Sequence, residues 1–197
     1  MRLSYTTERG PGWVRAAGYV LAFIAVLWLV EIADAVTIGS FHDEGIRPRT
    51  DEGLVGILLA PLVHLGWDHL VANTVPLLVL GFLVFLSGVG TAVRATAIIW
   101  LVGGLGTWLI GPERSVHIGA SGIVFGWLTY LLLRGIFARN EGQIALGAVV
   151  LILYGGALWG VLPGQPGVSW QGHLFGAIGG ILAARWLARR RRARRVA

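Results

Sequence analysis

The residues of this chain that could carry chemistry are a serine and a few histidines set within long apolar runs. Ser121 stands in the stretch Gly119-Ala120-Ser121-Gly122, and His173 stands in a later apolar run. Small residues often let two membrane helices pack closely, which is one interpretation of the serine stretch. A histidine buried in a membrane is costly and therefore indicates a function. A serine beside an imidazole can act as a nucleophile beside its base.

Glycine spacing indicates how Ser121 and His173 could meet. Glycines follow one another at four-residue spacing around His173: Gly172, Gly176 and Gly180. Gly122 and Gly126 form a matching ridge beside Ser121. Two such ridges can bring helices close enough for the serine and the imidazole to share a hydrogen bond. The alternative is an ordinary glycine contact in which His173 is a satisfied buried polar group.

A third motif, His64-Leu65-Gly66-Trp67-Asp68-His69, is followed by Asn73. His69 and Asn73 are four residues apart and share one helix face, whereas His64 belongs to the segment that precedes this helix. The motif could be a structural hydrogen-bond network between helices, or a set of donors aimed at an oxyanion. A zinc site is not expected, because no H-E-x-x-H motif occurs and the chain has no cysteine.

The composition indicates a polytopic membrane protein of the all-α class. Of the 197 residues, 55% are hydrophobic and 13% charged. The apolar runs predict six spanning helices at 16–38, 67–86, 92–110, 118–133, 144–162 and 170–187, and an interfacial segment at 54–65. We interpret the first run as a retained helix and not as a signal peptide, because it is long enough to span.

The fourth predicted helix is short, and this bears on the depth of Ser121. Residues 119–133 rise only about 22 Å, against an apolar bilayer core of about 30 Å. If this helix ends at the cytoplasmic face, Ser121 lies below the outer surface, where irregular backbone requires protein or water around it. We therefore expect Ser121 at the floor of a water-filled cavity, within the positive end of a helix dipole. A shortened helix could also be an accident of packing.

Charge predicts the orientation. The formal net charge is +6, and every basic residue is arginine. With both termini inside, thirteen arginines are cytoplasmic and three, Arg47, Arg49 and Arg114, lie outside, as the positive-inside rule requires. We expect a multi-pass protein of the cell membrane with a cytoplasmic segment 1–15, a membrane domain 16–187 and a tail 188–197. Seven arginines between Arg185 and Arg195 favour contact with anionic lipid over nucleic acid.

Taken together, the three motifs resemble those of the rhomboid family of intramembrane serine proteases. The stretch around Ser121 resembles the family's G-x-S-G at the head of the fourth of six helices. The second-helix pattern of histidine, histidine and asparagine is matched by His64, His69 and Asn73. The sixth-helix pattern is matched by His173, Gly176 and Gly180. The resemblance covers residues 54–187, and three separated motifs in order make it specific.

This resemblance implies a rhomboid-like six-helix bundle and a serine endopeptidase that cleaves transmembrane segments. Ser121 is the implied nucleophile and His173 the general base, in a dyad without an aspartate. The implied oxyanion hole consists of His69, Asn73 and the backbone N–H of Ser121. Four further residues are expected to support the site: His64, Gly119, Gly122 and Phe125. No metal or other cofactor is implied, and the oligomeric state is left open.

Two departures from the family pattern concern Phe125 and the first outer loop. Many members carry a tyrosine four residues after the serine, whereas Phe125 can stack on the base but cannot donate a hydroxyl. The loop 39–52 lacks the Trp-Arg pair of many members, which leaves its structural role open. The main alternative is a catalytically silent relative that binds membrane helices. A transporter is disfavoured, because no internal repeat is visible.

Overall fold

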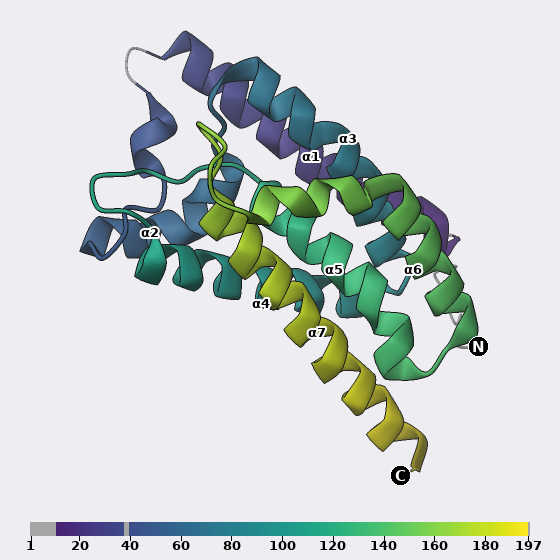
Figure 1. The fold of residues 1–197 in the computed structure, drawn as a ribbon. Coiled ribbons are helices and arrows are strands. Elements are labelled where there is room, and N and C mark those ends of the chain that lie inside the picture. The colour runs from purple at the N-terminus through teal and green to yellow at the C-terminus, as the bar shows by residue number, and fades with distance from the viewer. Residues whose placement is uncertain (1–10, 38–39, 197) are drawn as a thin grey trace, which may run out of the picture.

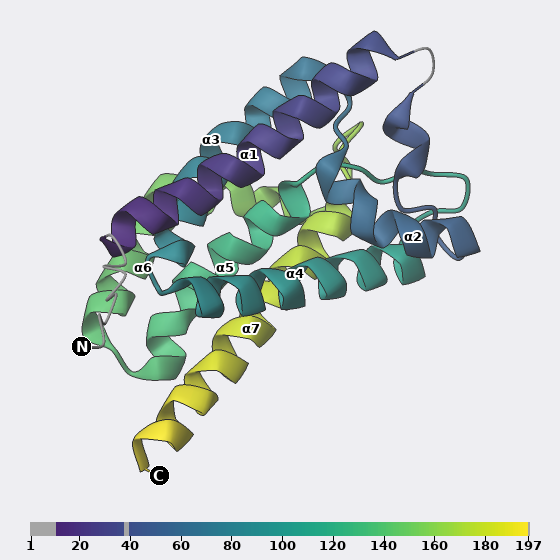
Figure 2. The same ribbon diagram turned by 180° about the vertical axis from the view of Figure 1, so that it is seen from behind.

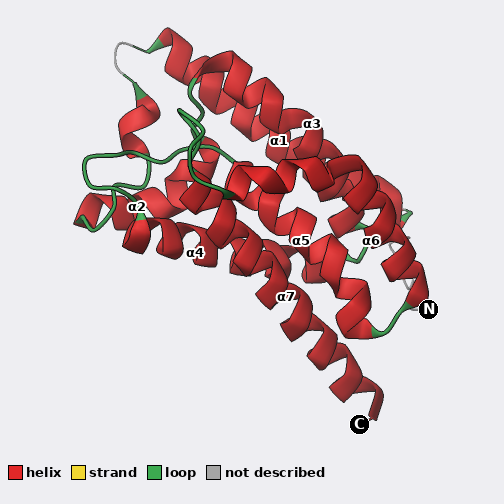
Figure 3. Ribbon diagram, viewed as in Figure 1, coloured by secondary structure: helices red, strands yellow, loops and turns green. Residues whose placement is uncertain are grey.

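The computed structural model describes residues 11–37 and 40–196, and these residues form helices joined by short loops (Figure 3). The α-helices are α1 (Gly12–Val36), α2 (Asp51–Leu59), α3 (Gly66–Phe85), α4 (Val89–Ile110), α5 (Ser121–Ala138), α6 (Glu141–Tyr154) and α7 (Trp170–Val196). Three short 3₁₀ helices are η1 (Phe41–Glu44), η2 (Ala60–Leu62) and η3 (Gly155–Val161). The first ten residues of the predicted N-terminal segment lie outside the described part.

Apolar composition accounts for the long helices. Within the described residues, five helical segments are long and apolar enough to cross a membrane: α1, α3, α4, α5 and α6 with its continuation η3. Helix α7, the sixth predicted span, is less apolar, because Gln171, His173 and Arg185 interrupt its apolar run. Gln171 and His173 are nonetheless buried, so α7 presents polar side chains to the interior of the bundle. The protein is thus a helical, multi-pass membrane bundle.

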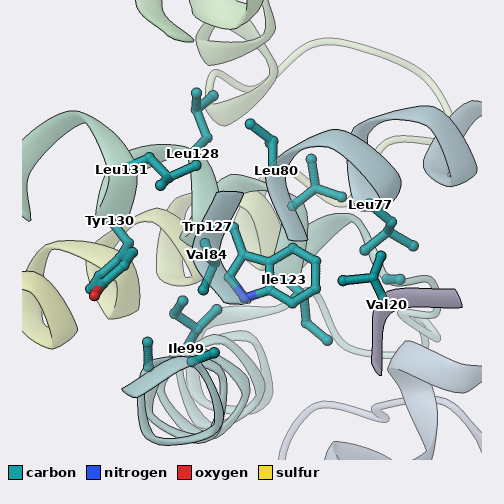
Figure 4. Packing of buried hydrophobic residues seen from close by; sticks show 14 of the residues in the cluster. Val20, Leu77, Leu80, Val84, Ile99, Ile123, Trp127, Leu128, Tyr130 and Leu131 are labelled. Carbon is teal, nitrogen blue, oxygen red and sulfur yellow. The ribbon is translucent and has the colours of Figure 1, made fainter. Parts of the chain in front are cut away.

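Helix α5 lies at the centre of the bundle and supplies much of its core. Trp127, Leu128 and Leu131 are almost fully buried and pack with residues of α3 and α4, including Leu80 and Ile99 (Figure 4). Helices α1 and α3 lie side by side along one flank (Figure 2). Residues 123–131 of α5 are all buried, so this part of the helix meets protein on every side, which fixes the orientation of the residues at its start.

Glycines bring α5 and α7 into backbone contact. A methyl group built on Gly176 would overlap the carbonyl oxygen of Gly122, and one on Gly180 would overlap that of Gly126. Thr129 Oγ1 adds a 2.8 Å hydrogen bond to the carbonyl oxygen of Ala177 in α7. The spacing between these helices is thus set by main chain against main chain, as in other close membrane-helix contacts.

The structure corrects several predicted element boundaries: α1, α4 and α6 begin three or four residues earlier than predicted, and α7 continues to Val196. Two further corrections concern α5 and the interfacial segment. Helix α5 continues past residue 133 to Ala138, so Arg134, predicted to begin a polar connection, lies inside the helix. Its buried side chain donates to Ser87 Oγ at the turn before α4 and lies over the Tyr130 ring. A buried partner allows the arginine to remain helical. With 18 residues α5 rises about 27 Å, still less than the bilayer core of about 30 Å.

The second corrected boundary is at the interfacial segment, which begins at residue 51 and not at 54. It consists of α2 and the 3₁₀ turn η2, and it is too short to span. Thr50 caps α2 by accepting a 3.0 Å hydrogen bond from the Gly53 N–H, which fixes the earlier start.

Helix α1 begins and α7 ends at the same end of the bundle (Figures 1 and 2). The turns between α3 and α4 and between α5 and α6 also lie there, whereas the start of α5 and the loop before α7 lie toward the opposite end. Such an arrangement is that of a chain that crosses an even number of times. The cytoplasmic assignment of the termini and the limits of the three predicted segments stay predictions.

Candidate active site

The chain enters α5 through a sharp bend that only glycine accommodates well. Gly119 has φ 108°, and a side chain on it would meet the His69 ring. Ala120 is the N-cap residue, so Ser121 is the first residue of the helix. The N–H groups of Ser121 and Gly122 therefore have no acceptor within the helix and are available to an anion. Gly119, expected to support the site, provides this bend.

The structure brings Ser121 and His173 into hydrogen-bond contact. Ser121 Oγ lies 2.8 Å from His173 Nε2, although the residues are 52 positions apart. His173 Nδ1 lies 2.9 Å from the carbonyl oxygen of Gly160, which can only accept a hydrogen bond. The Nδ1 atom therefore carries the proton of a neutral imidazole, and Nε2 accepts from the serine hydroxyl. The pair has the geometry of a nucleophile and its general base.

Gly160 was not singled out by the sequence patterns. It lies in the 3₁₀ segment η3 that continues α6, and its main-chain oxygen is what orients the imidazole. A backbone acceptor carries no side-chain signature, so no motif could have revealed it. In a dyad without a carboxylate, this carbonyl occupies the position of the third, orienting group.

Phe125 stacks on the imidazole of His173. The ring centroids are 4.1 Å apart and the planes are inclined by 10°. A side chain on Gly160 would collide with the far edge of the Phe125 ring, so the phenyl group is confined between η3 and the imidazole. The stacking expected from a phenylalanine at this position is therefore present without the hydroxyl of a tyrosine.

His69 and Asn73 project from the first turns of α3 toward the same region. His69 Nδ1 accepts a 3.2 Å hydrogen bond from the Leu65 N–H, which leaves the proton on Nε2. A methyl group built on Gly119 would lie 2.6 Å from Cε1 and 2.8 Å from Nε2 of His69, so this edge of the ring lies beside the start of α5. Asn73 Nδ2 uses one hydrogen to bond the carbonyl oxygen of His69 at 3.0 Å and retains another.

His64 supports the backbone that precedes Ser121. Its Nε2 atom accepts a 3.3 Å hydrogen bond from the Ala120 N–H, and its side chain is almost fully buried. Burial, aided by the neighbouring His69, lowers the pKa of His64 to about 4. The imidazole is therefore neutral near pH 7, as an acceptor of this bond must be. Among the described residues, no three His, Asp or Glu side chains are arranged to hold a metal ion.

The start of α5 borders a cavity of about 730 Å³. Ser121, His173, His69 and Asn73 all line it. Two residues that the sequence patterns did not select, His117 and Ser169, lie in the same wall. A serine just before a predicted helix is an N-cap signal, but nothing in the sequence pairs Ser169 with His117.

The loop 40–50 is held without a Trp-Arg pair. Arg49 donates to the carbonyl oxygens of Leu109 and Gly111 at 3.0 and 2.8 Å. Ile46 and His117 exchange two backbone hydrogen bonds of 2.9 and 3.0 Å. The loop therefore braces the segment that leads into Ser121, which answers the question left open by its sequence.

Comparison with known proteins identifies similar chains. The family model described as "Rhomboid domain" matches residues 51–190. An uncharacterized protein of Mycobacterium tuberculosis is 53% identical over 187 residues, which cover 91% of this chain and 78% of that protein. An uncharacterized protein of Mycobacterium leprae is 48% identical over 186 residues, 90% and 74% of the two chains.

More distant relatives have descriptive names. YdcA of Bacillus subtilis, named as a candidate rhomboid protease, is 29% identical over 170 residues, which cover 83% of this chain and 84% of that protein. The matched family region contains the start of α5, the first turns of α3 and the first turns of α7. All three motifs therefore lie inside it.

Proposed function

Because the chain belongs to the rhomboid family, we propose that it is an intramembrane serine endopeptidase that cleaves transmembrane segments of other membrane proteins. The observation that carries this proposal is the 2.8 Å contact between Ser121 Oγ and His173 Nε2, at a helix N-terminus that borders a cavity. A hydroxyl is a weak nucleophile until a base takes its proton, and a neutral imidazole suits that task near pH 7.

The proton positions support a conventional acyl-transfer sequence. Ser121 Oγ attacks the scissile carbonyl carbon while its proton passes to His173 Nε2, and the carbonyl oxygen becomes an oxyanion. The C–N bond then breaks, and the same proton goes to the leaving amine. A water molecule, deprotonated by the same nitrogen, hydrolyses the acyl-enzyme and restores the serine. The Gly160 carbonyl holds the ring in the required tautomer through both steps.

Three donors are available to the oxyanion: the backbone N–H of Ser121, His69 Nε2–H and Asn73 Nδ2–H. His69 keeps its Nε2 proton because the Leu65 N–H occupies Nδ1. Donors held in place before the reaction stabilise developing charge, and loss of one typically costs about 100- to 1,000-fold in turnover. This assigns His69 and Asn73 a chemical role in place of a structural one.

The membrane setting defines the substrate class. A peptide bond must be extended to enter a serine protease site, so a substrate helix with small or helix-weakening residues near its outer end is the expected target. We further propose the cell membrane as the location, with both termini cytoplasmic and the arginine-rich tail at anionic headgroups.

The test is cleavage of a labelled single-span substrate by purified protein in proteoliposomes. We expect wild type to cut and both Ser121→Ala and His173→Ala to lose at least about 1,000-fold in rate. Equal cutting by all three proteins would refute the dyad. Substrate binding by wild type without cleavage would instead support the catalytically silent alternative.

A further inference from the structure

A second serine–histidine hydrogen bond lies one helical turn before the first, with the residue types exchanged. His117 Nδ1 is 2.7 Å from Ser169 Oγ. His117 precedes Ser121 by four residues and Ser169 precedes His173 by four, so both pairs are 52 positions apart. The His117–Ser169 pair, called the outer pair below, therefore connects the same two chain segments that carry the proposed dyad. The Ser121–His173 pair is called the inner pair.

The direction of each hydrogen bond around His117 follows from the carbonyl oxygen of Pro112, which can only accept. Ser115 Oγ donates its single proton to the carbonyl oxygen of Pro112 at 2.6 Å. It must therefore accept from His117 Nε2, 2.9 Å away. Burial lowers the pKa of His117. The neutral ring accepts at Nδ1, and Ser169 must donate to it.

Ser169 also begins helix α7. Its Oγ accepts a 3.2 Å hydrogen bond from the Gly172 N–H, the bond of an N-cap residue. Its carbonyl oxygen accepts the N–H of His173 itself at 3.1 Å. Both polar groups of Ser169 thus act on the single helical turn that carries the imidazole of the proposed dyad.

The loop before Ser169 offers that turn little support. Residues 162–167 are exposed, and Gly164 and Gly167 have φ angles of 110° and 74° with nothing within 4 Å of a methyl group built on either. His117, by contrast, is buried, and its backbone is paired with Ile46. The outer hydrogen bond therefore connects a weakly held helix start to a firmly held segment.

We propose that His117 is a positioning residue for the proposed reaction: through Ser169 it fixes the first turn of α7 and so the approach of His173 Nε2 to Ser121 Oγ. This inference rests on the proposed protease function and deepens it. The glycine contacts further along α7 set the distance between the helices. The His117–Ser169 bond fixes the position of the first turn of α7 relative to α5.

A positioning role differs measurably from a purely structural one. A misplaced general base slows the chemical step and leaves substrate affinity in place, so kcat falls while KM changes little. A bond that only stabilises the fold lowers the melting temperature with kcat unchanged in the folded fraction. The variant His117→Asn distinguishes a positioning role from a structural one. The Oδ1 atom of asparagine, like the Nδ1 atom of histidine, is bonded to Cγ. Asparagine can accept from Ser169 while it lacks the Nε2 bond to Ser115.

The experiment compares kcat, KM and melting temperature for wild type, His117→Ala, His117→Asn, Ser169→Ala and the double alanine variant. We expect each single alanine change to lower kcat about 10- to 100-fold with KM within about twofold. The double variant should be no slower than Ser169→Ala, since both changes break one link. His117→Asn should recover most of the rate. Thr96→Val is the control, because it deletes a partly buried hydrogen bond from Trp127 away from the cavity and should leave kcat unchanged.

Three results would overturn the inference, and the first two are an unchanged kcat in His117→Ala and losses in the double variant that multiply those of the single variants. A His117→Asn variant as slow as His117→Ala would do so too. A wild-type protein that cuts no substrate and reacts with no serine-directed probe would mark failure of the proposed function instead. The two failures are therefore distinguishable.

Discussion

The molecule contains two serine–histidine pairs of nearly equal length, and their surroundings differ. In both pairs the histidine accepts from the serine with one nitrogen and donates with the other, to Gly160 at the inner pair and to Ser115 at the outer. Ser121 stands at a bend and faces the donors of α3, whereas the Ser169 oxygen already accepts the N–H of Gly172. The inner histidine, His173, is stacked on the ring of Phe125.

A hydrogen bond to an imidazole does not by itself make a serine reactive. A nucleophile also needs a free lone pair and donors placed where the oxyanion forms. Ser121 combines these features, whereas the Ser169 Oγ atom accepts the Gly172 N–H and caps α7. We therefore assign chemistry to the inner pair and positioning to the outer one. The predictions below change residues that surround the inner pair, from the largest expected effect to the smallest.

The largest effect is expected from the glycine contact beneath the inner pair. Gly176→Leu should force α5 and α7 apart, because even a methyl group there overlaps the Gly122 carbonyl. We expect cleavage to fall below detection and the melting temperature to drop. Gly18→Leu on α1 is the matched control, since a methyl group there meets no atom within 4 Å, and it should leave both quantities unchanged. Wild-type cleavage by Gly176→Leu would show that the glycine contact does not set the dyad distance.

The next effect concerns the donors on α3. Asn73→Ala should lower kcat about 100- to 1,000-fold at similar KM, because it removes an oxyanion donor. Thr74→Val, the next residue on the same helix, removes the partner of Trp28 in α1 and should keep the wild-type rate. Steady-state cleavage by both variants measures the contrast. Equal rates for the two would assign Asn73 a structural role only.

A smaller effect is expected at the stacked ring. Phe125→Leu should lower kcat about 3- to 10-fold, the equivalent of one lost aromatic contact, because the imidazole loses the surface that holds it. Phe125→Tyr keeps the ring and should cleave within about twofold of wild type. A leucine variant that cleaves like wild type would mean that the Gly160 hydrogen bond alone orients the base.

The smallest effect concerns stability against pH at His64. Its folded pKa of about 4 lies below the 6.5 of an unperturbed histidine, so the unfolded chain binds more protons between these values. The contribution of the neutral ring to stability is complete above pH 6.5 and is lost as the pH falls toward 4. We expect His64→Gln, which can accept from Ala120 without titrating, to flatten the fall in melting temperature over this window. A slope identical to wild type would exclude His64 as its source.

Much of this architecture was predictable from apolar periodicity and spacing. The runs of the sequence locate the spanning helices, and the glycine spacing around His173 predicts the close contact of α5 and α7 that the structure contains. The predicted end of α5 was wrong, because an arginine in an apolar run usually marks the end of a membrane helix. Arg134 continues the helix only because Ser87, distant in sequence, meets it.

The site was predictable where side chains form motifs and hidden where main chain or loops contribute. Ser121, His173, His69 and Asn73 were named from spacing, and the structure gathers them around one cavity. Gly160 contributes a carbonyl oxygen, which any residue possesses, so no pattern identified it. The His117–Ser169 bond depends on how two loops meet, which local sequence does not determine.

The most direct test of the central claim is to locate the adduct of a serine-reactive fluorophosphonate by mass spectrometry of the digested protein. Wild type and Ser169→Ala should carry the adduct on Ser121, more slowly formed in the variant, and Ser121→Ala should carry none. An adduct on Ser169, equal labelling of Ser121→Ala, or an unlabelled wild-type protein would contradict the assignment of Ser121 as the nucleophile.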